Sequence, residues 1–307
     1  MTSIVVLGST NMDLVAYVAK APARGETVTG RSFRTIPGGK GANQAVAAAR
    51  AGGEVAMIGA VGSDDFGYRL RDTLEHCSVD TDLLRTVEGP SGTAHIVVDD
   101  EGGNAIVVVP GANGTVTSLS HGDEALIANA DLLLLQLELP LSVVVDGAAH
   151  ARRSGVRTVL TPAPVQPLPP ELFDVTDLLV PNEHEATALT GRADPHAAAL
   201  ALLEVVPEVV VTLGAAGSLY ASRDLAEPVL VPAPPVTAVD STGAGDTFVG
   251  ALAVALGEGR PVPEALAWAG TAAALSVRRE GASTSMPYRV EIEAAFLSPH
   301  ILEADAV

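Results

Sequence analysis

Cysteine, long apolar runs and basic leader segments are all scarce or absent in this sequence. Cys77 is the only cysteine among 307 residues, so no disulfide can form within the chain and no cysteine cluster can bind a metal. No uninterrupted apolar stretch reaches about 18 residues, so we expect no membrane span. The first residues, MTSIVVLGST, lack the basic and apolar segments of a signal peptide. We therefore expect a soluble, cytoplasmic protein.

Positive charge and aromatic residues are also scarce. The chain has 18 lysines and arginines against 37 acidic residues, a formal net charge of −19, and only 3% aromatic residues. Nucleic acids and anionic membranes attract basic surfaces, so neither is expected as a general partner. A local pocket could still bind an anionic ligand. The 48% hydrophobic and 18% charged residues are typical of a globular protein with an aliphatic core.

Short apolar runs recur along the chain and are separated by alanine-rich segments of helical length. The runs are SIVVLG, EVAMIG, DLLLLQLEL, VRTVLTP, DLLVPN, EVVVTLG and GSLYAS. Such runs are typical of strands buried on both faces of a parallel sheet. Their alternation with helices from about residue 130 to 280 indicates an α/β fold. We predict a three-layer αβα, Rossmann-like sandwich with a mostly parallel central sheet.

Two segments depart from this alternation. Residues 12–36 alternate polar and apolar side chains without a helical stretch, and residues 91–110 are typical of a hairpin, with SGTAHIVVDD and NAIVVVP joined by Glu-Gly-Gly. We expect these segments to form a small β-sheet inserted in the α/β body. No internal repeat or linker divides the chain, so residues 1–307 are expected to form one domain with this inserted sheet.

The segment AVDSTGAGDTFVGALAVAL, residues 238–256, passes from a strand-like run through a glycine-rich turn into an apolar helix starting near Gly245. The unpaired N–H groups and the dipole of a helix start favour an anion, and glycines let a phosphate approach the backbone. Asp246 could cap this helix, or it could be a general base for a hydroxyl that attacks the bound anion. The two glycines, Gly243 and Gly245, and the nearby acid Asp240 favour the second interpretation.

A second glycine-rich turn lies in IPGGKGANQAVAAARAGG, residues 36–53, before a helix expected from about Ala42 to Ala51. Lys40 is followed by Gly41 instead of Ser or Thr, so this is not a Walker A loop. The chain also lacks G-x-G-x-x-G, which argues against an NAD-dependent dehydrogenase. Lys40 and Asn43 could hold hydroxyls or phosphate oxygens. Alternatively, the segment simply connects a loop to a helix.

Three further polar groups follow expected strands. Asn11 and Asp13 would point to one side of an extended chain, which suits a polyol, although such residues are common in turns. Asn182 and Glu185 would share a face at a helix start, where they could cap the helix or orient phosphate and magnesium-bound water. Glu138 follows an apolar run at the carboxyl end of a strand, where open α/β sheets bind ligands. It could equally be a surface charge.

The order of these segments is similar to that of the ribokinase-like carbohydrate kinase family. The two most specific matches are GGKGANQAVAAARAG and DSTGAGDTFVGAL. The other matching segments, in order, are GSTNMDL, GETVTG, LLLQLELP, PNEHEA, VVVTLGAAG and REGASTSMP. The resemblance covers about residues 3 to 290. GETVTG together with GGKGANQAVAA is more similar to the ribose-phosphorylating members than to fructose or adenosine kinases.

The resemblance implies ATP-dependent phosphorylation of the 5-hydroxyl of D-ribose. Asp246 would be the general base, and the anion hole for the transferred phosphoryl group would be formed by the amides of Gly243, Ala244 and Gly245. The sugar contacts would be Asn11, Asp13, Gly39, Lys40, Asn43, Glu138 and Asp246. The contacts to ATP and Mg²⁺ would be Asn182, Glu185, Thr212, Leu213, Gly214, Ala215, Ala216, Gly217, Gly245 and Gly270.

The resemblance also implies a monovalent cation site, usually for potassium, and a lid. The cation ligands would be Asp240, Thr242, Ser276, Arg279, Gly281 and Ser285. The inserted β-sheet would close over the sugar and pair with the lid of a second copy in a homodimer. Two positions depart from the family pattern: Ser241 replaces the usual threonine, and Gly270 stands where the adenine site would have a larger polar residue such as His or Asn.

Two alternatives remain at this stage. The same chemistry could act on another sugar or a nucleoside, such as 2-deoxyribose, fructose or adenosine, although the scarcity of aromatic residues disfavours a nucleobase pocket. The chain could also be a non-catalytic sugar- or nucleotide-binding regulator, because a fold does not determine a function. Such a regulator could have lost Asp246, a glycine of the anion hole or Lys40, and all of these are present.

Overall fold

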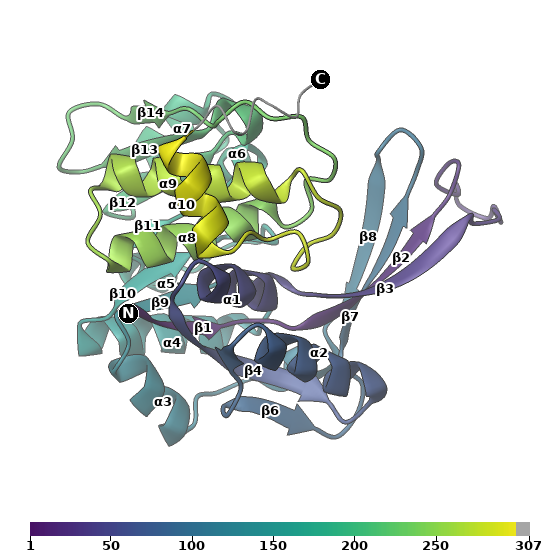
Figure 1. The fold of residues 1–307 in the computed structure, drawn as a ribbon. Helices are drawn as coiled ribbons and strands as arrows, with labels where there is room; N and C mark the ends of the chain where they lie inside the picture. The colour runs from purple at the N-terminus through teal and green to yellow at the C-terminus, as the bar shows by residue number, and fades with distance from the viewer. Residues whose placement is uncertain (299–307) are drawn as a thin grey trace.

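A large mixed sheet forms the centre of the computed structural model, which describes residues 1–298 (Figure 1). Its strands lie in the order β14-β13-β12-β11-β10-β9-β1-β4-β5, and β6 also pairs with β4. In chain order, the strands are β1 Ser3–Leu7, β4 Glu54–Gly62, β5 Val79–Asp80, β6 Leu84–Val87, β9 Leu132–Leu135, β10 Arg157–Leu160, β11 Leu178–Leu179, β12 Glu208–Thr212, β13 Ser218–Ser222 and β14 Val229–Val231. The mostly parallel central sheet is confirmed.

The sheet becomes antiparallel at one edge. All pairings from β12 across to β5, and that of β6 with β4, are parallel. By contrast, β12 pairs with β13, and β13 with β14, in antiparallel register. The connection from Thr212 to Ser218 is too short for the helical crossover that a parallel pair needs. The apolar run at GSLYAS therefore returns as a hairpin instead of continuing the alternation of strand and helix.

Helices cover both faces of the sheet (Figure 1). One face carries α1 Lys40–Arg50, α2 Asp65–His76, α8 Ala244–Gly257, α9 Val262–Ser276 and α10 Arg289–Leu297. The other face carries α3 His121–Ala128, α4 Leu141–Ser154, α5 Pro170–Asp174, α6 Glu183–Thr190 and α7 Pro195–Leu202. Alternate residues of β1 divide between the two cores: Ile4 and Val6 pack on the first side, and Val5 and Leu7 on the second. The predicted three-layer sandwich is confirmed.

A separate four-stranded sheet, in the order β3-β2-β7-β8, projects from the body (Figure 1). Its strands are β2 Asn11–Tyr17, β3 Ser32–Gly38, β7 Gly92–Val98 and β8 Asn104–Val109. The β2–β3 and β7–β8 pairs are antiparallel, whereas β2 and β7 pair in parallel. The hairpin predicted within residues 91–110 is therefore confirmed. We call this sheet the small sheet.

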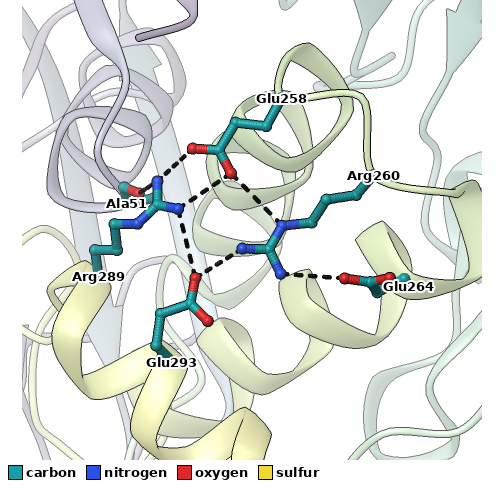
Figure 2. Close-up of polar contacts among 6 residues, drawn as sticks. All are labelled: Ala51, Glu258, Arg260, Glu264, Arg289 and Glu293. Atoms are coloured by element: carbon teal, nitrogen blue, oxygen red, sulfur yellow. Dashed lines mark hydrogen bonds and ion pairs between the residues drawn. The ribbon is translucent and has the colours of Figure 1, made fainter.

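An ion-pair network joins the carboxyl ends of α1 and α8 to α10 (Figure 2). Arg289 of α10 donates to both carboxylate oxygens of Glu258, which follows α8, and lies 3.5 Å from the carbonyl oxygen of Ala51, which follows α1. Arg260 lies 3.5 Å from Glu258 and 4.9 Å from the ring centroid of the buried Trp268. Arg260 also pairs with Glu264 at 3.4 Å and with Glu293 at 2.7 Å. The network therefore links the ends of α1 and α8 to α10.

The helices of the described chain are all unsuited to crossing a bilayer. Within residues 1–298, none combines sufficient length with sufficient apolar character to span a membrane.

Candidate active site

The predicted site residues lie where the parallel strands end. β1, β9, β11 and β12 all finish at the same edge of the sheet, and Asn11, Glu138, Asn182 and the turn at 212–217 follow these strands directly or within a few residues. The helices α1 and α8 begin at this edge and pack against each other. Open α/β sheets bind ligands at the carboxyl ends of their strands. Residues far apart in the sequence are therefore brought together by the sheet topology.

The start of α8 has a free helix terminus. Gly243 precedes the helix with φ of 72°, a left-handed conformation that glycine adopts readily. Within the described residues, no side chain makes a capping hydrogen bond there. A Cβ atom added to Gly245 would meet nothing within 4 Å, so the backbone is open to an approaching group. This combination suits an anion, because the first N–H groups of the helix lack partners within it.

Asp246, in the first turn of α8, does not cap the helix. Its Oδ2 accepts a hydrogen bond from Asn43 Nδ2 at 3.1 Å, and its Oδ1 accepts one from Gln44 Nε2, also at 3.1 Å. Both donors lie on α1. The carboxylate is therefore held across the α1–α8 contact beside the open helix start, where an acid–base role is available to it.

Four ionisable groups share this region: Asp13, Lys40, Glu138 and Asp246. Burial raises the pKa of Asp13 to about 7, and the charges of Glu138 and Asp246 add to this effect. Burial also raises the pKa of Asp246, although Lys40 and the two amide hydrogen bonds oppose the shift. Burial alone would lower the pKa of Lys40, but the carboxylates around it raise that pKa overall. The cluster thus holds a charged lysine beside Asp13 and Asp246, two carboxyl groups whose pKa values are raised.

Candidate sugar contacts from β2, from the start of α1 and from the segment after β9 meet at this cluster. Glu138 Oε2 accepts hydrogen bonds from the Lys40 backbone N–H at 3.0 Å and from Asn11 Nδ2 at 3.4 Å. A Cβ at Gly38 would lie 2.4 Å from Asp13 Oδ2, and one at Gly39 would lie 2.7 Å from the Asn11 backbone nitrogen. The glycines therefore let β3 and α1 approach β2 closely enough for Asp13 and Lys40 to share one site.

Sequence reasoning missed several buried polar residues of this region. Asn113 Nδ2 donates to Asn11 Oδ1 at 2.8 Å, and Gln136 Nε2 donates to Gln44 Oε1 at 2.7 Å. One signal was available, because Gln136 interrupts the apolar run DLLLLQLEL, where a polar side chain needs a partner. Asn113 lies in a short 3₁₀ helix, Gly111–Thr115, and no pattern in the sequence marks it.

Asn182 and Glu185 form a capping box at the start of α6. Asn182 Oδ1 accepts from the Glu185 backbone N–H at 2.8 Å, and Glu185 Oε2 accepts from the Asn182 backbone N–H at 2.8 Å. The helix-cap alternative is therefore realised. Burial nevertheless raises the pKa of Glu185, with Lys40 and Asp246 among the charges acting on it. The cap consequently lies within electrostatic range of the four-group cluster.

The candidate nucleotide turn at 212–217 adjoins this cap. Thr212 pairs with Asn182 in an isolated parallel bridge, and its backbone N–H donates to the Pro181 carbonyl at 2.9 Å. A short 3₁₀ helix at Gly214–Ala216 follows. Gly270 lies within α9, half-buried, and a Cβ there would meet nothing within 4 Å. The space beside Gly270 could therefore accommodate a larger group.

Two of the candidate cation ligands, Thr242 and Gly281, contact a third, Asp240. Asp240 accepts hydrogen bonds from the Thr242 backbone N–H at 2.9 Å, from Thr242 Oγ1 at 2.6 Å and from the Gly281 backbone N–H at 2.8 Å. Burial alone would raise the pKa of Asp240, but these hydrogen bonds lower it below its usual value. An ionised carboxylate among hydroxyl and carbonyl oxygens is a suitable donor set for a hard cation.

The other candidate cation ligands have partners of their own. The hydroxyls of Ser276 and Ser285 donate to carbonyls of their own segments, and the Arg279 side chain pairs with Glu291. A guanidinium has no acceptor atom, so Arg279 can offer a cation only its carbonyl oxygen. Across residues 1–298, no three His, Cys, Asp or Glu side chains are grouped to hold a metal ion, so a cation here would need backbone or hydroxyl oxygens in addition to the Asp240 carboxylate.

Comparisons with known proteins point to one family. The model of the pfkB family carbohydrate kinases matches residues 1–289. The ribokinase of Bacillus subtilis (strain 168) is 45% identical over 296 residues, covering 95% of this chain and 99% of that protein. The ribokinase of Mus musculus is 40% identical over 304 residues, covering 95% of this chain and 94% of that protein.

Solved structures agree with these relatives. The structure of Arabidopsis thaliana ribokinase complexed with ribose and ATP has a TM-score of 0.90 and 34% sequence identity, covering 96% of this chain and 99% of that one. The structure of a Burkholderia thailandensis nucleoside kinase in complex with inosine has a TM-score of 0.83 at 22% identity, and this similarity extends to the fold alone.

Proposed function

Because the chain belongs to the pfkB family of carbohydrate kinases, we propose that it transfers the γ-phosphoryl group of ATP to the 5-hydroxyl of D-ribose. Similarity over nearly the whole chain to ribokinases, one of them solved with ribose and ATP, supports this substrate pair. The observation that carries the chemistry is the position of Asp246 beside the uncapped start of α8. We place the reaction in the cytoplasm, where ATP is available.

In this reaction Asp246 accepts the proton of the sugar hydroxyl as the hydroxyl oxygen attacks the phosphoryl group. The backbone N–H groups of Gly243, Ala244 and Gly245 stabilise the charge on the transferred group. Phosphoryl transfer requires positioning and charge stabilisation more than covalent chemistry. A helix start with a carboxylate beside it therefore supplies most of what the protein must contribute.

The remaining members of the cluster hold the sugar. Asn11, Asp13 and Glu138 offer acceptors and a donor for ribose hydroxyls, and Lys40 keeps a positive charge close to the reacting groups. Glu138 already accepts hydrogen bonds from the Lys40 backbone N–H and from Asn11 Nδ2, so the Glu138 and Asn11 side chains are already held together at the start of α1. Gly39 and Asn43 complete the set of sugar contacts that we propose.

Two cations fit the residues present. Mg²⁺ bound with ATP would supply neutralisation of the phosphate charge, and Asn182 and Glu185 would orient its waters from the start of α6. The turn at 212–217 and the space beside Gly270 would hold the nucleotide. A potassium ion would be held by Asp240, Thr242 and carbonyls of the 276–285 segment. In that position it would fix the turn that precedes α8 without contacting the sugar.

We also propose that the small sheet is a lid over the sugar within a single domain, and that two copies pair through it. Asn11 and Asp13 belong to β2, so the sheet carries sugar contacts at its base. Ile106 and Val107 of its outer strand β8 are 52% and 65% exposed, and Phe33 of β3 is 62% exposed. Exposed apolar surface of this kind is typical of an interface.

Release of ADP in the presence of Mg-ATP tests the proposed function. The purified protein would be assayed with ribose, 2-deoxyribose, fructose and adenosine, each with potassium and with tetramethylammonium. We expect ribose-dependent turnover that potassium stimulates. Turnover on another acceptor would support the alternative substrate while retaining Asp246 as base. Binding of ribose without any turnover would support a non-catalytic regulator.

A further inference from the structure

A chain of buried amides runs from the end of β9 to Asp246. Gln136 Nε2 donates to Gln44 Oε1 at 2.7 Å, and Gln44 Nε2 donates to Asp246 Oδ1 at 3.1 Å. Gln44 is 0% exposed and Gln136 is 1% exposed. Gln44 Nε2 also donates to Thr161 Oγ1 at 3.2 Å. The proposed reaction assigns no role to Gln136, which Gln44 separates from the carboxylate in this chain of hydrogen bonds.

The packing around Gln136 makes room for this arrangement. A Cβ on Gly8 would lie 2.3 Å from Gln136 Oε1 and 2.7 Å from the Gly41 Cα atom. Only glycine at position 8 therefore lets β1, α1 and β9 meet with the Gln136 side chain between them. Among the described residues, Gln136 Oε1 has no hydrogen-bond partner, and an unpaired buried oxygen costs free energy. The hydrogen bond that offsets this cost is therefore the one that Gln136 Nε2 donates to Gln44.

The partners of Gln44 fix which end of its amide faces Asp246. An amide offers two donors at nitrogen and an acceptor at oxygen. Turning Gln44 alone would set its oxygen against the Asp246 carboxylate and its nitrogen against the nitrogen of Gln136. Turning both amides would restore the bond between them, but the Gln44 oxygen would still face Asp246, where only a protonated carboxyl could donate to it. The observed orientation, in which Gln136 donates to Gln44 and Gln44 donates to Asp246, is therefore the one that suits an ionised Asp246, and loss of the Gln136 donor removes one of the bonds that favour it.

We propose that Gln136 is a positioning residue for phosphoryl transfer, which acts by locking Gln44 so that Asp246 stays ionised and correctly oriented. Asn43 holds the second carboxylate oxygen at 3.1 Å, so both oxygens are restrained. The hydrogen bond that Gln44 accepts at its oxygen polarises its amide, which strengthens the hydrogen bond that its nitrogen donates to Asp246. This inference rests on the proposed role of Asp246 as general base.

Other charges act on Asp246 as well. Those facing it from the neighbouring elements are Lys40 of α1, Asp13 of β2, Glu138 after β9 and Glu185 of α6. Lys40 favours the ionised form, and the three acids oppose it. The amide chain therefore works with Lys40 against the burial and the neighbouring carboxylates.

The pH dependence of kcat tests this role with Gln136→Met, which keeps the length of the side chain and removes its donor. We expect kcat to fall about 3- to 10-fold near neutral pH, on the scale of one lost hydrogen bond between neutral amides. The acid limb of the kcat profile should move to higher pH, because Asp246 then holds its proton more tightly. KM for ribose should stay within about twofold, because the ground-state sugar contacts are intact. Gln166→Met is the matched control, since Gln166 Nε2 donates to the Leu137 carbonyl at 3.3 Å beside the same segment.

A double-mutant comparison separates action through Gln44 from general loosening. Gln44→Met should move the acid limb in the same direction, and adding Gln136→Met should change it no further. Gln136→Leu replaces Gln136→Met if the latter does not fold, and it is judged by the same limb. A folded Gln136 variant with a wild-type acid limb overturns the inference. Absence of ribose turnover in the wild-type protein overturns the proposed function instead.

Discussion

At the residue scale, Asp246 is the side chain on which the proposed chemistry depends. It accepts hydrogen bonds from Asn43 and Gln44 and leaves the start of α8 open. Asp246→Asn removes the proton acceptor with almost no change in shape, so kcat should fall by about 10²–10⁴-fold. Ribose affinity, measured by calorimetry, should survive. Asp65→Asn, in the first turn of α2, is the control, and an unchanged kcat in Asp246→Asn would refute the assignment.

A second prediction at this scale concerns Asp13 and pH. Its pKa is raised from 3.8 to about 7 in the folded protein, so the folded state holds this proton more tightly than the unfolded chain does. The free energy of unfolding therefore falls as the pH rises through this window. Asp13→Asn removes that penalty. Its gain in Tm over the wild type should grow from pH 5 to pH 8, and a gain independent of pH would contradict the pKa shift.

The sequence allowed some of these residues to be predicted and not others. Asp246, Lys40 and Asn43 could be identified because glycine-rich turns mark the starts of α1 and α8. Gln136 and Asn113 could not be assigned, because their partners come from segments far away in the chain. A polar residue in an apolar run shows that a partner is needed, but only the packing of the strands shows which partner it is.

At the element scale, the site depends on the close crossing of α1 and α8. A Cβ at Gly250 of α8 would lie 2.6 Å from the Ala47 Cβ, 2.7 Å from the Ala48 nitrogen and 2.8 Å from the Gln44 carbonyl oxygen. Gly250→Ala should therefore push the helices apart and cost about 1–3 kcal/mol of stability. It should also lower kcat, because the donors on α1 move away from Asp246.

Gly147→Ala is the matched control for this crossing. Gly147 is a buried glycine of α4, on the opposite face of the sheet, and its added Cβ would meet the Leu7 Cδ2 atom, the end of a flexible side chain, at 2.5 Å. Thermal melts and kcat would be measured for both variants. A Gly250→Ala enzyme with wild-type kcat would show that the spacing of α1 and α8 does not control the base.

Element types were more predictable than their pairing. The short apolar runs and the hairpin within 91–110 appear as strands, and α8 begins at Ala244, next to the expected start at Gly245. The short strands β5 and β6 and the edge strand β14 were missed, because so few residues carry little periodic signal. The direction of β13 followed from the length of its connection, and composition alone did not indicate it.

At the scale of the whole molecule, the outer strand of the small sheet is the surface best suited to a second copy. All residues of β8 are exposed, although its sequence is NAIVVV. An unpaired apolar edge strand is a template for pairing. Val107→Lys should therefore shift the protein from dimer to monomer in sedimentation velocity. Leu200→Lys, at an exposed site on α7, is the control, and a wild-type protein that is monomeric would contradict the proposed pairing.

The ³¹P NMR spectrum of the product formed from ribose and Mg-ATP tests the central claim most directly. Transfer to the 5-hydroxyl places the phosphorus three bonds from the two C5 methylene protons, so the new phosphomonoester signal should be a triplet. The control acceptor 5-deoxyribose, which lacks this hydroxyl, should give no such product. The Asp246→Asn protein should form the same ester only at the greatly reduced rate. A doublet from an anomeric or secondary phosphate, or free phosphate as the sole product, would contradict the account.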